Sequence, residues 1–130
     1  MGSQIAAGVI GIGTDVVEID RIERSLRRER FVEEIFGLRE RSYCQARARP
    51  GQHFAARFAA KEAFLKALGR GVFSGVALRE IEVVRDGDEA PRFELGPSAA
   101  RALAEAGGRQ ALLSLSHAGN VATAFVLVQP

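Results

Sequence analysis

The sequence predicts an α+β domain in which helices pack on one antiparallel sheet. Helical periodicity dominates residues 18–68, whereas residues 78–129 carry short runs typical of strands and hairpins, so the two kinds of element segregate along the chain. The chain has 130 residues, of which 47% are hydrophobic and 26% charged, as expected of one ordinary globular domain over residues 1–130. The expected order of elements is β-α-α-α-β-β-α-β-β.

The first element is a short buried strand. Its two apolar runs, Val9–Ile12 and Thr14–Val17, are broken by Gly11 and Gly13, and we expect Asp15 just beyond the glycine-rich end. A helix follows over residues 18–30, where apolar side chains recur at helical spacing: Ile19, Ile22 and Leu26.

Further helical stretches are expected at Phe31–Phe36, Arg39–Arg49 and His53–Leu68, with a break at Pro50-Gly51 before the last of them. Gly69 and Gly71 end this long helix, because glycine accepts the left-handed conformation at a helix C-terminus.

The second half contains two hairpins with a short Ala-rich helix between them. Polar or glycine-containing turns separate the strands of each hairpin. The expected elements are the strands Leu78–Arg85 and Arg92–Leu95, the helix Pro97–Ala106, and the strands Gln110–Ser116 and Val121–Gln129.

Positive charge is concentrated in the first half of the chain. Residues 1–70 carry 13 basic and 9 acidic side chains, a net charge of +4, while residues 71–130 carry 5 and 7, a net charge of −2. A positive face of this kind suits nucleic acid, a phosphorylated ligand or an acidic protein, and charge alone does not choose among them.

Several classes of protein are not expected. The single cysteine, Cys44, excludes an internal disulfide, offers no metal-ligand spacing and is expected to be a small, half-buried side chain. No apolar run approaches the length of a membrane span, and the start lacks the basic residues of a secretory signal. These features favour a cytoplasmic protein without a membrane partner.

Glu62 is the first candidate for chemistry. On a helical wheel it projects from within the apolar arc of the long helix, with Lys61 and Lys66 on either side. A carboxylate there needs a cationic partner or a metal, since burying an unpaired charge is very costly. The alternative is an ordinary surface pair between Glu62 and Lys66, one helical turn apart.

Asp15 is the second candidate, because the glycines before it allow a ligand to approach the backbone closely. The alternative is that Asp15 caps the following helix. Gly11-Ile12-Gly13 is too short to be a dinucleotide-binding fingerprint. Carboxylates such as Asp15 and Glu62, from separate elements, suit Mg²⁺ completed by waters and substrate phosphates.

Three basic residues suit phosphate. His117 ends a strand, where its ring either donates to a phosphate or closes a turn. Arg49 and Arg57 bracket the start of the long helix, and the planar guanidinium matches phosphate oxygens; each is otherwise a solvated surface charge.

The helix after the first strand presents many arginines on its outer faces. They form either a solvated face or a docking surface for an acidic partner, which would act through salt-sensitive electrostatic steering. The arginines are Arg21, Arg24, Arg27, Arg28 and Arg30.

Two long segments resemble the holo-acyl-carrier-protein synthase family of phosphopantetheinyl transferases. They are the segment Gly11-Ile12-Gly13-Thr14-Asp15-Val16-Val17-Glu18-Ile19-Asp20-Arg21-Ile22 and the segment Arg57-Phe58-Ala59-Ala60-Lys61-Glu62-Ala63-Phe64-Leu65-Lys66-Ala67-Leu68-Gly69. Their separation, the chain length and the terminal Ser116-His117-Ala118 strand-turn also agree, so the resemblance covers nearly the whole chain.

The resemblance implies an activity, partners and an assembly. The activity is transfer of the 4′-phosphopantetheine arm of coenzyme A to a serine of an apo acyl carrier protein, for fatty acid biosynthesis, with release of adenosine 3′,5′-bisphosphate. The resemblance also implies Mg²⁺ and a homotrimer with its active sites between subunits.

Roles for individual residues also follow from the resemblance. Asp15 and Glu62 match the metal-binding carboxylates, and Lys66 matches the lysine near the scissile phosphate. Gly69 matches the glycine beside the nucleotide. Positions near the 3′-phosphate are matched by Arg49, Arg57 and His117, and the carrier-docking helix by Arg21 and Arg28.

The chain departs from the family pattern at two places. Ala118 stands where many relatives have a hydroxyl residue, so one phosphate hydrogen bond is expected to be missing. Gly37-Leu38-Arg39-Glu40 lacks the usual threonine, which removes an expected helix cap. Neither change touches Asp15 or Glu62.

The chemistry of the implied reaction agrees with these residue types. A metal on the phosphate oxygens and a lysine on the leaving side neutralise the pyrophosphate, and Glu62, or a metal-bound water that Glu62 orients, takes the serine proton. Two rival functions are an RNA-binding module and a Mg²⁺-dependent phosphohydrolase. The Arg-rich stretch has almost no aromatic side chains, which disfavours binding to single-stranded RNA.

Overall fold

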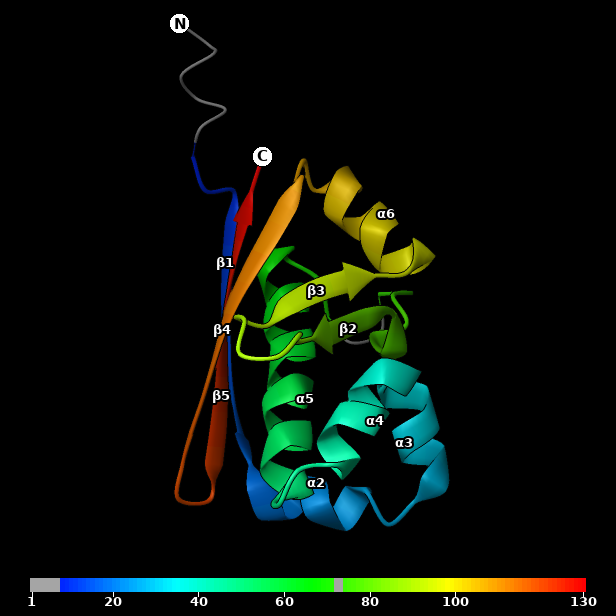
Figure 1. Ribbon diagram of the computed structural model, residues 1–130. Helices are drawn as coiled ribbons and strands as arrows, with labels where there is room; N and C mark the ends of the chain where they lie inside the picture. The colour runs from blue at the N-terminus through cyan, green and yellow to red at the C-terminus, as the bar shows by residue number, and fades with distance from the viewer. Residues whose placement is uncertain (1–7, 72–73) are drawn as a thin grey trace, which may run out of the picture.

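The computed structural model, which describes residues 8–71 and 74–130, confirms the predicted α+β class (Figure 1). Its elements in chain order are β1 (Gly11–Glu18), α2 (Ile19–Ser25), α3 (Glu29–Ile35), α4 (Leu38–Gln45), α5 (Pro50–Ala67), the 3₁₀ turn η1 (Leu78–Glu80), β2 (Ile81–Val84), β3 (Arg92–Leu95), α6 (Pro97–Glu105), β4 (Gln110–Ala118) and β5 (Val121–Gln129). Residues 1–7, on which the expectation about a secretory signal rests, lie outside the described residues. None of the helices within the described ranges has the length and apolarity needed to cross a membrane.

The five strands of the described chain form two antiparallel sheets, where one was predicted. The first and last strands pair in a three-stranded sheet of order β1-β5-β4, and among the described residues β2 pairs only with β3. The helix α5 lies between the two sheets, because its buried side chains face the three-stranded sheet on one side and the β2–β3 hairpin on the other (Figure 1). The hairpin therefore covers α5 instead of extending the first sheet.

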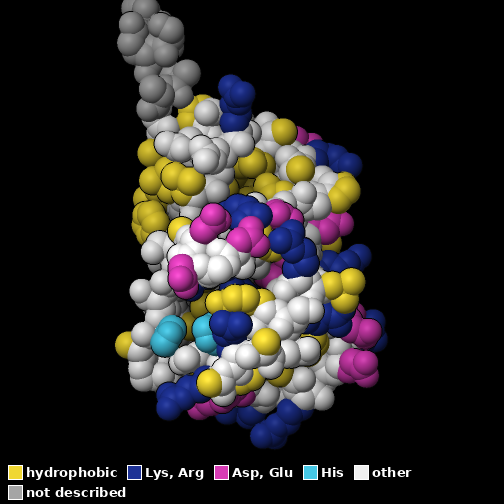
Figure 2. Space-filling view, in the orientation of Figure 1, with side chains coloured by type: hydrophobic (Ala, Val, Ile, Leu, Met, Phe, Trp, Pro, Cys, Tyr) yellow, Lys and Arg dark blue, Asp and Glu magenta, His cyan; other side chains and the backbone are white. Residues whose placement is uncertain are grey.

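The outer face of the three-stranded sheet carries exposed apolar side chains. Four large apolar side chains from its three strands are 45–61% exposed there: Ile12, Val16, Leu112 and Phe125. In Figure 2, hydrophobic side chains gather at the upper left, over this sheet. Patches of contiguous exposed apolar side chains commonly mark interaction surfaces.

Four helices precede the hairpin, where the predicted order has three. The backbone is extended at Arg28 and at Phe36, which separates α2, α3 and α4. Phe36 is buried and meets the ring of Phe54 edge-on, with the centroids 4.9 Å apart. This packing against α5 fixes the extended residue that ends α3.

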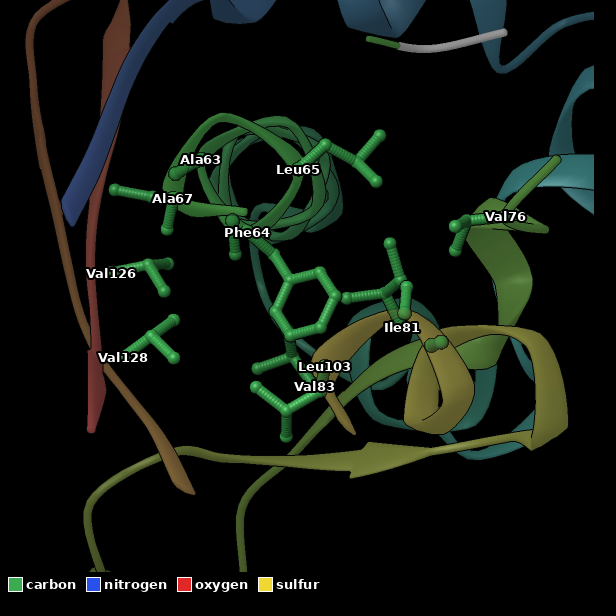
Figure 3. Close-up of a cluster of buried hydrophobic side chains, with 14 of the residues drawn as sticks. Ala63, Phe64, Leu65, Ala67, Val76, Ile81, Val83, Leu103, Val126 and Val128 are labelled. Carbon is green, nitrogen blue, oxygen red and sulfur yellow. The ribbon is translucent and has the colours of Figure 1, made fainter. Parts of the chain in front are cut away.

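The long helix α5 begins at Pro50, so the predicted break at Pro50-Gly51 is wrong. Proline at the first helical position loses no intrahelical hydrogen bond, because its N–H would have no partner there. Gly51 packs against the carboxylate of Glu23 on α2, where a Cβ atom would collide with it. The core between α5, the hairpin and the sheet is centred on Phe64 (Figure 3).

β1 runs unbroken through Gly11 and Gly13, contrary to the expected interruption. These glycines allow β1 to lie directly against the backbone of α5. A Cβ at Gly11 would overlap the carbonyl oxygen of Ala67, and one at Gly13 would overlap that of Ala63. The two signature-like segments are therefore in backbone contact.

A buried ion pair joins α5 to α4 and to the hairpin. Lys61, which flanks Glu62 on the helical wheel, is fully buried and donates from Nζ to Oε1 of Glu40 (2.7 Å) and to the carbonyls of Leu78 (3.1 Å) and Ile81 (2.7 Å). Burial raises the pKa of Glu40 and lowers that of Lys61. Because Nζ has three acceptors, each of the three N–H groups of the ammonium has a hydrogen-bond partner.

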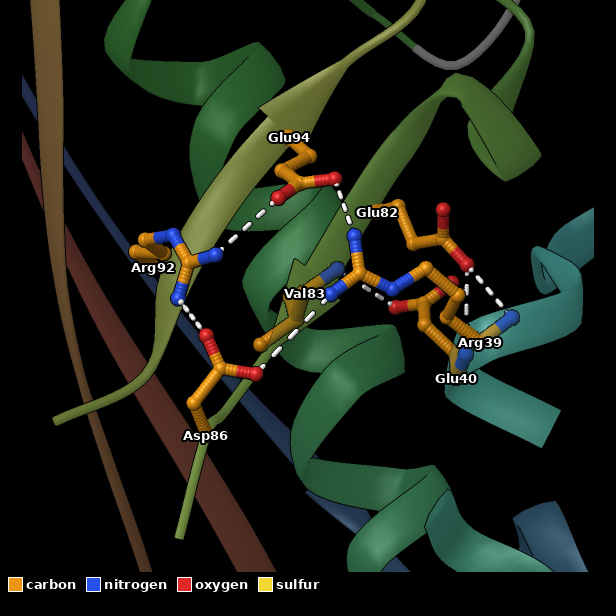
Figure 4. Close-up of polar contacts among 7 residues, drawn as sticks. All are labelled: Arg39, Glu40, Glu82, Val83, Asp86, Arg92 and Glu94. Carbon is orange, nitrogen blue, oxygen red and sulfur yellow. Dashed lines mark hydrogen bonds and ion pairs between the residues drawn. The ribbon is translucent and has the colours of Figure 1, made fainter. Parts of the chain in front are cut away.

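The missing threonine cap of α4 is replaced from the hairpin. Oε2 of Glu82 accepts hydrogen bonds from the backbone N–H groups of Arg39 (2.9 Å) and Glu40 (3.1 Å), the orphan donors at the start of this helix (Figure 4). Gly37 leaves room for this carboxylate, because a Cβ there would overlap it. Glu82 therefore replaces the missing threonine cap, although it lies 45 positions after Gly37.

Cys44 is fully buried on α4, deeper than the half-buried position expected. Burial raises the pKa of its thiol to about 12. The thiol therefore stays protonated at neutral pH, as expected of a structural side chain.

The contact between β1 and α5 leads to a stability prediction. Gly13→Ala forces the two backbones apart and is expected to lower the free energy of unfolding by about 3 kcal/mol. Urea denaturation measures the change. Gly71→Ala is the matched control, because Gly71 has open space around it, and it should change stability by no more than about 1 kcal/mol. Equal effects of the two substitutions would contradict the close packing.

Candidate functional site

The structure brings three of the predicted site residues together, on β1 and α5. Asp15 lies within β1, and its Oδ1 accepts a hydrogen bond from Nζ of Lys66 (2.9 Å), which also donates to the carbonyl of Thr14 (3.0 Å). Glu62 lies one helical turn before Lys66 on α5. We call Asp15, Glu62 and Lys66 the carboxylate cluster.

The structure does not show the alternative roles of these residues, which are a helix cap for Asp15 and a surface pair for Glu62 and Lys66. Asp15 does not cap α2, because β1 continues to Glu18 and the helix begins at Ile19. Among the described residues, Lys66 forms its ion pair with Asp15 (2.9 Å) and not with Glu62. The simple surface pair on α5 is therefore absent from this part of the chain.

Glu62 lies in a desolvated position beside a second negative charge. Burial raises the pKa of its carboxyl, the charge of Asp15 raises it further, and Lys66 partly opposes both effects. Two carboxylates that repel each other in a half-buried position are stabilised by a shared cation.

The carboxylate cluster fits a magnesium ion better than a metal held by protein groups alone. Across residues 8–71 and 74–130 there is no group of three or more His, Cys, Asp or Glu side chains placed to hold a metal. Mg²⁺ is commonly bound by one or two carboxylates with waters and substrate phosphates. Asp15 and Glu62 supply that number of ligands.

A second cluster surrounds two adjoining hollows of about 310 and 450 Å³, formed by the start of α5, the end of β4, the segment after α4 and the β2–β3 turn. Both hollows include Gln52, His53 and His117. Their basic lining residues define what we call the basic pocket: Arg47, Arg49, His53, Arg57, Arg85 and His117. Within the described chain, no Asp or Glu lines either hollow.

Arg57 is the most buried basic group of this pocket, with only 3% of its surface exposed. One terminal nitrogen donates weakly to the carbonyl of His53 (3.4 Å), and the guanidinium lies 4.4 Å from the ring centre of Tyr43. Its Nε has no hydrogen-bond partner among the described residues. A buried guanidinium without a carboxylate partner favours an anionic ligand.

His117 lies on the same face of the sheet as Asp15, since the residues of β1 and β4 are linked through β5. Val17 pairs with Ala122, which pairs with His117, and Asp15 pairs with Ala124. The two histidines, His53 and His117, approach each other with ring centres 6.4 Å apart, beside basic side chains (Figure 2).

The carboxylate cluster and the basic pocket lie on opposite flanks of α5. This helix covers Ala122 and Ala124 of the central strand, with β1 on one flank and β4 on the other. At about 100° per residue, His53 is about 180° and Arg57 about 140° from Glu62 around the helix axis. One copy of the chain therefore presents the two halves of the predicted site in different directions.

Gly69 follows the last turn of α5, on the side of Lys66. Its φ is +71°, a left-handed conformation that ends the helix, and the N–H of Arg70 bonds to the carbonyl of Leu65 (2.8 Å). The predicted helix end at this glycine is thus confirmed.

The predicted arginine-rich helix is divided. Arg21 and Arg24 lie on α2, whereas Arg28 lies in the extended turn before α3. Arg24 forms an exposed ion pair with Asp20 (3.9 Å), and Arg30 forms one with Glu34 (2.8 Å). In the described part of the chain no ion pair involves Arg21 or Arg28, so both are available to a partner.

Several residues of the basic pocket were not found from the sequence. Arg47 and Arg85 enter it from the turns after α4 and β2, which are distant in sequence. His53 carried a local signal, because it precedes Arg57 by one helical turn. Tyr43, whose ring centre lies 4.5 Å from the guanidinium of Arg47 and 4.4 Å from that of Arg57, gave none.

Comparisons with known proteins agree on one family. Residues 11–126 match the sequence model of the 4′-phosphopantetheinyl transferase superfamily. Over 123 residues the chain is 42% identical to a holo-acyl-carrier-protein synthase of Geotalea daltonii, covering 93% of this chain and 98% of the relative.

Solved structures of similar fold carry the same name. A holo-acyl-carrier-protein synthase from Neisseria meningitidis has a TM-score of 0.85 at 34% identity, covering 95% of this chain and all of the other. The Helicobacter pylori enzyme in complex with coenzyme A has a TM-score of 0.78 at 28% identity, covering 91% and 99%. The chain thus belongs to the 4′-phosphopantetheinyl transferase superfamily, and it resembles holo-acyl-carrier-protein synthases over nearly its whole length.

Proposed function

We propose that the protein transfers the 4′-phosphopantetheine arm of coenzyme A to a serine hydroxyl of an apo acyl carrier protein, with Mg²⁺. The product besides the holo carrier is adenosine 3′,5′-bisphosphate, and we place the reaction in fatty acid biosynthesis in the cytoplasm. The observation that carries the proposal is the convergence of Asp15, Glu62 and Lys66 from two distant segments. Coenzyme A in the H. pylori structure supports the choice of donor.

The carboxylate cluster would act on the reacting phosphate. Asp15 and Glu62 would hold Mg²⁺, which when bound neutralises charge on the pyrophosphate oxygens. The serine oxygen bonds to the phosphorus that carries pantetheine, and the bond from this phosphorus to the adenosine 5′-phosphate breaks. Lys66, with 56% of its side chain exposed, can turn from Asp15 to the departing phosphate.

Glu62 is our candidate for the group that takes the serine proton. In the metal-free protein, burial and the charge of Asp15 raise the pKa of its carboxyl, so the group is more basic than an ordinary glutamate. With Mg²⁺ bound, Glu62 would either take the proton itself or orient a water that does so. Lys66 keeps the ionised form accessible by opposing this shift.

The basic pocket would bind the nucleotide end of coenzyme A. Arg49, Arg57 and His117 would contact its 3′-phosphate, and Gly69 would lie beside the nucleotide. The unpartnered Nε of buried Arg57 and the carboxylate-free lining support this assignment. Because Lys66 and Gly69 lie at the other end of α5, one ligand would have to be shared between two copies of the chain.

We therefore propose a homotrimer in which each active site combines the carboxylate cluster of one subunit with the basic pocket of the next. The number three comes from the resemblance to the family. The open apolar face formed by Ile12, Val16, Leu112 and Phe125 supports self-association, because it is uncovered in a single copy.

Arg21 and Arg28 would dock the carrier protein, since carriers of this kind are acidic and helical. A hollow of about 210 Å³ beside Arg28 is lined by Arg30, Phe31 and Glu34, and the guanidinium of Arg28 lies 5.7 Å from the ring centre of Phe31. A charged group over an aromatic ring offers both attraction and apolar contact.

The first prediction from the proposed function concerns Glu62. With coenzyme A, Mg²⁺ and an apo carrier protein, the wild type should add the mass of phosphopantetheine to the carrier, and Glu62→Gln should lower the rate at least about a hundredfold. Mass spectrometry of the carrier measures the transfer. Glu105→Gln, an exposed glutamate on α6, is the control and should keep the wild-type rate.

Other outcomes of this assay are informative. A wild type that modifies no carrier with any divalent metal would refute the transferase activity. Release of inorganic phosphate without a modified carrier would point to a phosphohydrolase. An active Glu62→Gln variant would exclude Glu62 from the mechanism.

The second prediction concerns carrier docking. Arg21→Glu combined with Arg28→Glu should raise KM for the carrier about tenfold or more, because two attractive charges become repulsive. The affinity for coenzyme A should stay nearly unchanged. Arg101→Glu, an exposed residue on α6, is the matched control. An equal loss of carrier and coenzyme A binding would place these arginines in the nucleotide site instead.

The third prediction concerns assembly. Light scattering should give the mass of a trimer for the wild type and that of a monomer for Phe125→Asp, which places charge on the apolar face. Leu38→Asp alters a side chain that is 72% exposed on α4 and should leave the trimer intact. A wild-type monomer would contradict the proposed assembly.

A further inference from the structure

The proposed function leaves one ionisable residue of the basic pocket without a role. His53 lies in the first turns of α5 and lines both hollows of the pocket, together with His117. Its ring stands edge-on to that of Tyr43, with the centroids 5.9 Å apart, and at 63° to that of His117. The ring is therefore held between two aromatic neighbours at the point where the two hollows join.

Every charged group that faces His53 is basic. Arg57 lies on α5, and Arg49 directly precedes this helix. Arg47 follows α4, and Arg85 follows β2. From β4 the facing ionisable group is His117, and from α4 it is the phenol of Tyr43. In the described chain no carboxylate lines the pocket to balance an imidazolium.

These basic surroundings therefore favour the neutral imidazole of His53. Burial lowers the pKa of His53, and the charges of Arg57, His117, Arg47 and Arg85 lower it further, in that order. A phosphate that enters among these groups reverses the sign of the local field, because it carries close to two negative charges at neutral pH. Its oxygens also accept hydrogen bonds from a doubly protonated ring.

We propose that His53 is a further phosphate-binding residue of the basic pocket and that it takes up a proton from solvent as the 3′-phosphate of the nucleotide enters. This inference rests on the proposed function, which assigns the pocket to that phosphate. No covalent bond changes: one proton moves from water to a ring nitrogen, and the imidazolium then donates to a phosphate oxygen.

The affinity of the basic pocket for phosphate therefore depends on pH. Phosphate raises the pKa of His53 from its lowered value in the free pocket, so binding takes up protons at pH values between the free and bound pKa. The contribution of His53 to affinity is present at low pH and is lost as the pH rises through the bound pKa. The gain in affinity is therefore complete at pH values below the pKa of the free pocket and absent well above the pKa of the bound state.

Calorimetry of adenosine 3′,5′-bisphosphate binding tests this proposal. Titrations at pH 7 in buffers of different ionisation enthalpy count the protons taken up per ligand. The wild type should take up more protons than His53→Gln or His53→Phe, and both variants should bind about tenfold more weakly near pH 6.5. The phosphate's own titration is common to all proteins and cancels in the difference.

Two controls separate this role from a structural one. His53→Phe keeps an aromatic ring against Tyr43, so a variant that retains the thermal unfolding midpoint but loses proton uptake isolates the titration. His117→Gln should bind more weakly yet retain the extra proton uptake, because His53 is still present.

Coenzyme A and its analogue without the 3′-phosphate provide the last comparison. The wild type and His53→Gln should differ for coenzyme A and agree for the analogue. Equal proton uptake and equal affinity for adenosine 3′,5′-bisphosphate in the wild type and both His53 variants would overturn the inference while leaving the proposed function intact. A wild type that binds none of these nucleotides would overturn the proposed function and the inference together.

Discussion

The architecture depends on the close contact between the backbones of β1 and α5. Gly11 and Gly13 permit it, because any side chain there would overlap the carbonyl oxygens of Ala67 and Ala63. The contact sets both the height and the rotation of α5 over the sheet. Asp15, two residues after Gly13, consequently meets Lys66 and comes close enough to Glu62 to raise the pKa of its carboxyl. The buried Lys61–Glu40 pair joins the opposite side of the same helix to α4, and its hydrogen bonds with Ile81 and Val83 join it to the hairpin.

This placement divides the candidate site. A helix that covers the central strand must present one flank to β1 and the other to β4, so the carboxylate cluster and the basic pocket point away from each other in a single chain. We propose that association through the apolar sheet face resolves this division by joining unlike halves of neighbouring subunits. A small domain can then bind a long ligand such as coenzyme A without enclosing it.

The sequence predicted those features that local patterns determine. The α+β class, the glycine that ends α5 and the inward side of α2 follow from periodicity and glycine chemistry. Features that depend on distant residues could not be predicted in this way. Glu82 replaces the threonine cap of α4, and the backbone and side chain of Asn120 accept hydrogen bonds from the first N–H groups of α2. Arg57 taken alone suits a surface charge, and the helical wheel places Lys61 beside Glu62 without revealing its partners, yet tertiary packing buries both.

The central claim is that each active site uses the carboxylate cluster of one subunit and the basic pocket of another. Mixed trimers of Glu62→Gln and Arg57→Gln chains test it most directly, when the two variants are refolded together and carrier modification is measured. Each variant alone should be nearly inactive. Random mixing should restore about one quarter of the wild-type activity, because about a quarter of the sites then combine two intact halves. Mixtures that stay as inactive as the separate variants would contradict the claim.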